Sequence, residues 1–152
     1  MKAVVQRVAW AAVEVGEEEV GRIGEGLLVY LGCVHGDGEA EAAKMARRLA
    51  KLRVFEDEDG RTNLDLRAAG GAILVVSQFT LAADTAGGNR PSFSGAQDAA
   101  TAAILVNCVQ ERLREEGFQV ESGRFGATMR VSSLNRGPAT YLLDIQPAST
   151  TE

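Results

Sequence analysis

Two polar segments follow apolar runs of the sequence, and their groups could do chemistry. Ser77, Gln78 and Thr80 come directly after the run GGAILVV, in the segment SQFTL. Hydroxyl and amide groups can orient a substrate or stabilise an oxyanion. The alternative is a strand end whose hydroxyls bond to nearby backbone groups. The second segment, NRGPAT at 135–140, places a Gly-Pro pair between strand-like runs, and taken alone it predicts a turn.

The usual catalytic groups have no recognisable spacing in the sequence. His35 is the one histidine, so a zinc site would need it together with both cysteines and a carboxylate, and no Cys-x-x-Cys or His-x-x-x-His spacing supports such a site. Cys33 and His35 lie two residues apart, which leaves open either a Cys–His dyad or a structural pair at a strand end. No nucleophile elbow and no glycine-rich phosphate or dinucleotide loop occurs. We therefore expect no metal, no cofactor and no conventional protein nucleophile.

Composition predicts one soluble domain with its own core. The chain has 152 residues, of which 45% are hydrophobic and 24% are charged. Its first residues lack the uninterrupted apolar stretch of a signal peptide, and no segment is long and apolar enough to span a bilayer. Two cysteines without framework spacing favour a reducing compartment. We expect a cytoplasmic protein.

The net charge limits the partners that the protein can bind. The formal net charge is −5 at pH 7. Broad binding to a nucleic-acid duplex depends on many Lys and Arg contacts to phosphate, so this charge argues against it. Any contact with nucleic acid should be local.

The elements that position the two polar segments are strands grouped around two helices. Runs from KAVVQRV to LLVYLGCV predict strands in the first third of the chain. Apolar residues spaced by three and four predict amphipathic helices over about 37–52 and 96–116. GGAILVVSQFTL, FQVESG, ATMRVSS and TYLLDI predict further strands. This order predicts an α+β fold with a compact, mostly antiparallel, barrel-like sheet and two helices over residues 1–146, followed by a flexible tail at 147–152.

Four segments in a fixed order carry a family resemblance. VSQFTLAADT, GNRPSF, GRFGATM and NRGPAT resemble the D-aminoacyl-tRNA deacylases, the D-Tyr-tRNA deacylase family, and the resemblance runs from MKAVVQRV to about Asp144. It implies a homodimeric hydrolase that cleaves the ester between a D-amino acid, or glycine, and the terminal adenosine of tRNA. It implies no membrane and no DNA partner. The alternative is a non-catalytic module of the same fold that binds tRNA acceptor ends or dimerises.

The resemblance implies that the Gly-Pro pair selects the hand of the substrate. Gly137 and Pro138 would form a cis peptide that enters the partner subunit's active site and excludes the side chain of an L-amino acid. Arg136 and Ala139 replace the acidic residue and the valine that the family commonly has. We expect Arg136 to alter docking between subunits or to contact phosphate.

The resemblance also implies how the ester is cleaved. The N–H of Phe79 would donate to the ester carbonyl, while Ser77 and Gln78 would shape and orient the site. Thr80 has no base beside it in the sequence, so it is a poor nucleophile. The ribose 2′-OH, which is adjacent to the ester, can assist instead. Thr80 then supports the site without attacking the ester.

Five further residues receive supporting roles from the resemblance. Phe125 and Met129 would line the pocket of the terminal adenosine, with simple core residues as the alternative. Arg7 would hold the carbonyls of the Gly-Pro loop, with an exposed strand arginine as the alternative. Asn135 and Thr140 flank the Gly-Pro pair and would support it.

Overall fold

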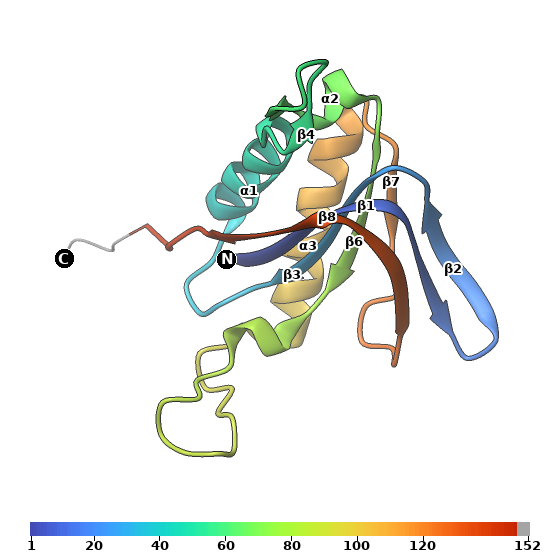
Figure 1. Cartoon of the computed structure of the whole chain (residues 1–152). Coiled ribbons are helices and arrows are strands. Elements are labelled where there is room, and N and C mark those ends of the chain that lie inside the picture. Colours follow the sequence, from blue (N-terminus) through green and yellow to red (C-terminus); the bar gives the residue numbers. More distant parts are fainter. Residues whose placement is uncertain (149–152) are drawn as a thin grey trace.

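Strand β1 organises the sheet, because it pairs with three other strands in this computed structural model, which describes residues 1–148. The first half of β1 (Lys2–Val15) pairs antiparallel with β3 (Gly26–Gly32). Its second half pairs antiparallel with β2 (Glu18–Ile23). Its other edge pairs along most of its length with β8 (Arg130–Asp144). KAVVQRV and the following AAVEV therefore form one long strand instead of two (Figure 1).

The remaining strands of the large sheet are parallel to one another. Strand β6 (Ala72–Ser77) runs parallel to β3, and β7 (Val120–Ser122) runs parallel to β6. Helical connections allow this geometry, because a crossover returns the chain to the same end of the sheet. The prediction of a mostly antiparallel sheet is therefore wrong in this part, and the sheet is mixed.

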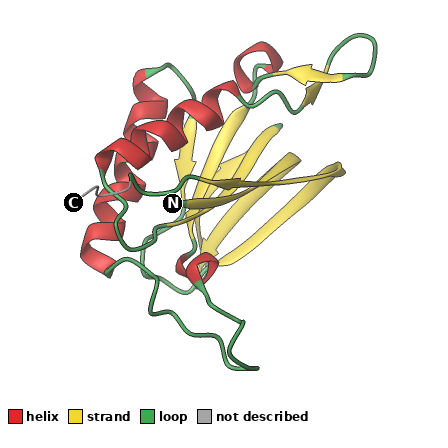
Figure 2. Cartoon of the chain, turned by 90° about the vertical axis from the view of Figure 1, so that its left-hand side faces the viewer, coloured by secondary structure: helices red, strands yellow, loops and turns green. Residues whose placement is uncertain are grey.

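Two long helices cover one face of the sheet (Figure 2). They are α1 (Glu39–Lys51) and α3 (Ala99–Glu115), close to the predicted ranges. Asp98 is the N-cap of α3, because its carboxylate accepts a hydrogen bond from the N–H of Thr101 in the first turn. A large core lies between these helices and the sheet.

The prediction of two helices missed two short ones. They are α2 (Leu66–Ala69) and the 3₁₀ helix η1 (Phe79–Ala82). A single turn carries too little apolar periodicity to be recognised. The charged segment FEDEDGRTN, expected as a loop, contains the strands β4 (Phe55–Glu56) and β5 (Thr62–Leu64), which pair as a hairpin.

The sheet curls until it is nearly closed. A second core lies inside the curl, on the face away from the helices, and includes Val8, Val13 and Leu74. Gly21 of β2 packs against β7, where a Cβ atom would lie 2.7 Å from the carbonyl oxygen of Ser122. Only glycine permits this approach, which brings the two sides of the barrel-like sheet together.

The Gly-Pro pair lies within β8 and does not end a strand. Pairing with β1 shifts from Gln6 opposite Thr140 to Val8 opposite Asn135. Residues 136–139 of β8 therefore lie opposite Arg7 alone, as a large bulge. The interpretation of NRGP as a turn between two strands is wrong, because the strand continues on both sides of the bulge.

No helix within residues 1–148 has the length and hydropathy needed to cross a membrane. Residues 149–152, which include most of the tail expected from residue 147, lie outside the described residues. The single domain over 1–146 stays a prediction.

Candidate active site

A cavity of about 440 Å³ opens where the parallel strands β3 and β6 end. Its walls come from η1, from the start of α3 and from the segment before β8, and the loop between η1 and α3 extends away from the sheet next to it (Figure 1). Most of the lining is apolar, and its polar side chains include those of Ser77, Gln78 and Gln97. Ligand sites commonly combine apolar walls with a few polar groups in this way.

Ser77, Gln78 and Phe79 line this cavity, as the SQFTL segment led us to expect. Ser77 is the last residue of β6, and Phe79 begins η1. The backbone N–H of Phe79 has no backbone partner among residues 1–148, as is usual in the first turn of a helix. This N–H is therefore free to bind a ligand. The Phe79 ring packs against Phe93 with the ring centroids 5.2 Å apart.

Thr80 is exposed and does not line the cavity. Its Oγ1 accepts a hydrogen bond from Nε2 of Gln78, at 2.6 Å. The hydroxyl thus holds the Gln78 amide in place. This contact fits a supporting residue better than a nucleophile.

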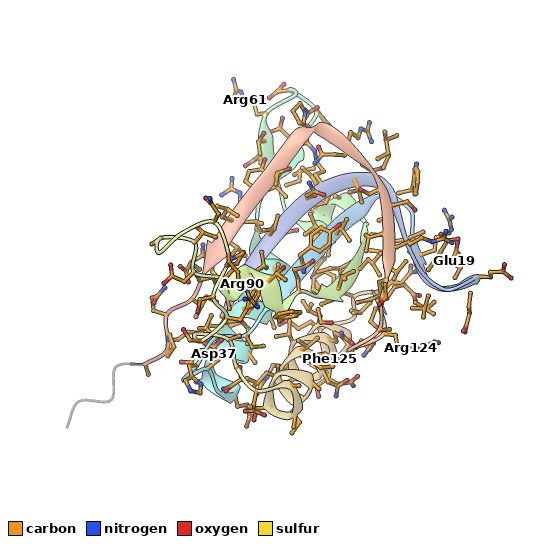
Figure 3. The ribbon with its side chains drawn as sticks, turned by 90° about the horizontal axis from the view of Figure 1, so that it is seen from below. Glu19, Asp37, Arg61, Arg90, Arg124 and Phe125 are labelled. Atoms are coloured by element: carbon orange, nitrogen blue, oxygen red, sulfur yellow. The ribbon has the colours of Figure 1, made fainter. Side chains whose placement is uncertain are left out.

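Phe125 and Met129 line the same cavity as Ser77, Gln78 and Phe79. Figure 3 shows Phe125 beside α3, and its side chain is 42% exposed. Met129 is half-buried and also packs against the inner core. Phe125 is therefore not a simple core residue, and Met129 belongs to both the cavity and the core.

The Gly-Pro bulge forms a second cluster, which is separate from the cavity of its own chain. The Gly137-Pro138 peptide bond is cis, and neither residue lines the cavity. Nε of Arg7 donates to the carbonyl oxygen of Arg136 at 2.9 Å, and Nη1 donates to that of Val54 at 2.8 Å. Arg7 thereby ties the bulge to the chain just before β4, and its side chain is only 11% exposed. The alternative of an exposed strand arginine is wrong.

Asn135 closes the base of the bulge with three hydrogen bonds. Its Oδ1 accepts from the N–H of Ala139 at 2.8 Å, and its Nδ2 donates to the Ala139 carbonyl and to Oγ1 of Thr140. These contacts fix the backbone on both sides of the Gly-Pro pair. Arg136 points to the surface, where it pairs with Glu25 at 3.2 Å.

The structure does not join Cys33 and His35 into a dyad. Cys33 is buried at the cavity, and burial, together with the nearby Asp37 carboxylate, raises the pKa of its thiol to about 11. His35 is exposed, and its Nδ1 lies 3.4 Å from Oε1 of Gln97. Residues 1–148 contain no hydrogen bond between the two side chains and no cluster of three His, Cys, Asp or Glu able to hold a metal ion.

Sequence reasoning missed Gln110 of α3, which lines a smaller cavity next to this one. Gln110 is buried among apolar helix residues, four positions after Val106 and three before Leu113. A polar residue on the apolar stripe was the available signal.

Proteins of known family resemble the chain over nearly its whole length. The family model described as D-Tyr-tRNA(Tyr) deacylase matches residues 4–144. The D-aminoacyl-tRNA deacylase of Roseiflexus sp. (strain RS-1) is 56% identical over 144 residues, which cover 95% of this chain and 93% of that protein. The structure of the c-Myc DNA Unwinding Element Binding Protein is similar with a TM-score of 0.91 and 40% identity, over 96% of this chain and 99% of that one.

A more distant structure, that of a probable eukaryotic D-amino acid tRNA deacylase, shares the fold. Its TM-score is 0.81 at 18% identity, over 95% of this chain and 98% of that one. The family match and the close relatives confirm the resemblance and the expectation of a hydrolase. The chain belongs to the D-Tyr-tRNA(Tyr) deacylase family.

Proposed function

We propose that the chain hydrolyses the ester of D-aminoacyl-tRNA, and of glycine carried on tRNA, to release the amino acid and the tRNA. Family membership and relatives named D-aminoacyl-tRNA deacylase support this reaction. The observation that carries the finer proposal is the cavity with the free N–H of Phe79 at its edge. We place the activity in the cytoplasm, with the tRNA acceptor end as the ligand and no cofactor.

The cavity suits the terminal adenosine of tRNA. Phe125 and Met129 offer an aromatic ring and a polarisable thioether to the base, and stacking on aromatic side chains is the usual way in which proteins hold unpaired bases. The base would lie against these residues, and the ester would lie at Gln78 and Phe79. A local contact of this kind is compatible with a net charge of −5.

Ester cleavage would rely on the RNA, because the cavity offers no suitable base. Among the described residues that line it, Cys33 is the one ionisable side chain, and its raised pKa keeps the thiol protonated near neutral pH. The N–H of Phe79 would stabilise the oxyanion that forms when water adds to the ester carbonyl. The adjacent 2′-OH would activate this water, since an intramolecular group can reach effective molarities on the order of 10⁵ M or more.

Two substitutions at one position test the role of the Phe79 N–H. Phe79→Pro removes this N–H, and proline is tolerated in the first turn of a helix. We expect kcat for D-Tyr-tRNA to fall about 100- to 1,000-fold. Phe79→Ala is the matched control, because it keeps the N–H and removes the ring. Equal activity of the two variants would contradict the proposed donor.

The 2′-OH is tested on the substrate. A D-Tyr-tRNA whose terminal ribose carries hydrogen at C2′ and keeps the ester on the 3′-oxygen should be hydrolysed far more slowly than the natural ester. An unchanged rate would remove RNA assistance. Thr80→Val would then show whether the threonine hydroxyl takes part in the reaction.

Rejection of L-amino acids is assigned to the Gly-Pro bulge of a partner subunit. The bulge does not line the cavity of its own chain, and Arg7 and Asn135 hold it in a fixed shape at the surface. Among residues 1–148, strand β8 pairs with β1 alone and so leaves one edge unpaired, and it exposes Leu134 and Leu142, so a second copy can cover this face. In such a homodimer the bulge would meet the side chain of an L-amino acid, whereas glycine and D-amino acids would fit.

Mixed dimers test whether the bulge acts across subunits. One subunit carries Gly137→Ala and an intact cavity, and an excess of the second carries Phe79→Pro and an intact bulge. The only active cavity then receives the intact bulge, so hydrolysis of L-Tyr-tRNA should be lower than in the Gly137→Ala homodimer. Unchanged hydrolysis of L-Tyr-tRNA would assign the bulge to its own subunit.

A non-catalytic module of this fold is the second candidate. The lack of a protein base at the cavity favours it. Such a module would bind D-Tyr-tRNA without releasing tyrosine. A single-turnover assay that follows both bound tRNA and free amino acid separates the two functions.

A further inference from the structure

A second, smaller cavity of about 130 Å³ adjoins the candidate active site. Ser77, Val106 and Phe125 border both cavities, so these three side chains form a shared wall. Helix α3, Val75 of β6 and the segment Ser122–Gly123 at the end of β7 form the rest of the smaller cavity. A ligand packed against Phe125 in the larger cavity therefore has the smaller one beside it.

Gln110 is one of the polar residues that line the smaller cavity. The residue is only 8% exposed, and its side chain makes no hydrogen bond to any residue from 1 to 148. In the same residues, no fully enclosed side-chain nitrogen or oxygen lacks a partner, so the Gln110 amide must open to the cavity. An amide that is open to a cavity and has no partner in the protein keeps its donor and acceptor available for a ligand there.

The lining of the smaller cavity selects a neutral ligand. Asn107 and Ser122 add an amide and a hydroxyl, and none of the described residues around the cavity is charged. A phosphate or a free amino group would find no opposite charge there. The Gln110 carboxamide offers one donor and one acceptor side by side. This pair matches the edge of adenine, which presents an amino group next to a ring nitrogen.

We propose that Gln110 binds the amino edge of the terminal adenine and makes the enzyme selective for adenosine at the end of the acceptor strand. This inference rests on the proposed function, because the base must first lie against Phe125 in the larger cavity. Gln110 is then a specificity residue that lies outside the cavity assigned to the ester. Its loss should weaken binding of the substrate more than it slows the chemical step.

The test compares D-Tyr-tRNA that ends in adenosine with D-Tyr-tRNA that ends in purine riboside, which lacks the amino group. For the wild-type protein, KM should be about tenfold higher for the purine ester, with little change in kcat. Gln110→Leu and the more flexible Gln110→Met should show the higher KM with both substrates. Gln119→Leu is the matched control, because Gln119 is exposed and lies outside both cavities.

The outcomes separate this inference from the proposed function. If wild type hydrolyses both esters with equal KM, or if both Gln110 variants keep the preference for adenosine, base reading by Gln110 is overturned while deacylation stands. If wild type hydrolyses neither ester, the proposed function fails and the inference fails with it. The wild-type comparison needs no variant, so it holds even where a Gln110 variant does not fold.

Discussion

Replacing Arg7 with leucine should loosen the Gly-Pro bulge and destabilise the protein. Two hydrogen bonds of the Arg7 guanidinium are lost: Nε no longer donates to the Arg136 carbonyl, and Nη1 no longer donates to the Val54 carbonyl. The third contact, 3.8 Å from Nη2 to Glu56, contributes little because the Glu56 side chain is 61% exposed.

The size of the effect follows from the two carbonyls. A hydrogen bond from a charged donor contributes about 1.5–3 kcal/mol to stability. Arg136 is exposed, so water can replace the donor at its carbonyl, whereas Val54 is only 3% exposed. We therefore take the low end for the first bond and the middle for the second, and expect a loss of about 3–4 kcal/mol. At about 2–4 °C per kcal/mol, the melting temperature should fall by roughly 6–16 °C.

The assay combines thermal unfolding with hydrolysis of the two hands of Tyr-tRNA. Arg7→Leu should raise the hydrolysis of L-Tyr-tRNA relative to D-Tyr-tRNA, because the bulge is less firmly held. Arg7→Lys should be intermediate, since one ammonium cannot serve both carbonyls in the fixed geometry of a guanidinium. Arg22→Leu is the control, because Arg22 is exposed and its contacts, an ion pair with Glu19 and a position over the Trp10 ring, do not reach the bulge.

The reasoning is refuted if Arg7→Leu has the melting temperature of the wild type and the same discrimination between D-Tyr-tRNA and L-Tyr-tRNA. A loss of stability with unchanged discrimination would be a different result. It would show that Arg7 supports the fold and that the bulge holds its shape without it.

Three further substitutions or treatments have defined outcomes. Gly137→Ala should lower both the stability of the protein and its discrimination against L-Tyr-tRNA, because Gly137 has φ +151° and a Cβ atom would lie 2.8 Å from the nitrogen of Ala139. The melting temperature and the hydrolysis rates of D-Tyr-tRNA and L-Tyr-tRNA measure these effects. Gly21→Ala should destabilise the protein with little change in selectivity, since its Cβ would meet the Ser122 carbonyl at 2.7 Å, and a denaturant titration would show an unchanged midpoint if this is wrong. Iodoacetamide at pH 8 should leave Cys33 unmodified and the activity intact. Burial and Asp37 raise the pKa of the thiol to about 11, and the reactive thiolate forms only as the pH approaches that value. Mass spectrometry checks whether Cys33 is modified, and inhibition through Cys33 would support a thiol mechanism.

The sequence predicted the elements that are defined by local patterns. Helices α1 and α3 follow from apolar spacing, and β6 follows from an uninterrupted apolar run. The parallel pairing of β6 with β3 could not be read in this way, because it depends on where the connecting helices return the chain. The bulge in β8 was hidden for a related reason: Gly-Pro has the same local signature in a turn and in a bulge, and only the pairing with β1 distinguishes them.

The candidate site was predicted in parts but not in its arrangement. The SQFTL and NRGPAT segments were both recognised, and they lie in two separate clusters of the chain. Arg7 donates to the carbonyl of Val54, which is 47 residues away in sequence. A backbone carbonyl is present in every residue, so no sequence motif marks it as a hydrogen-bond partner. Gln110 could have been recognised from the sequence, because it is a polar residue on the apolar stripe of α3.

The central claim is that this protein hydrolyses D-aminoacyl-tRNA and leaves L-aminoacyl-tRNA intact. Single-turnover hydrolysis of D-Tyr-tRNA and L-Tyr-tRNA by the purified wild-type protein tests this claim most directly. We expect release of D-tyrosine and no release of L-tyrosine above the spontaneous rate. Equal release from both substrates would contradict the assignment of chiral selection to the Gly-Pro bulge. Release from neither would contradict the deacylase activity itself.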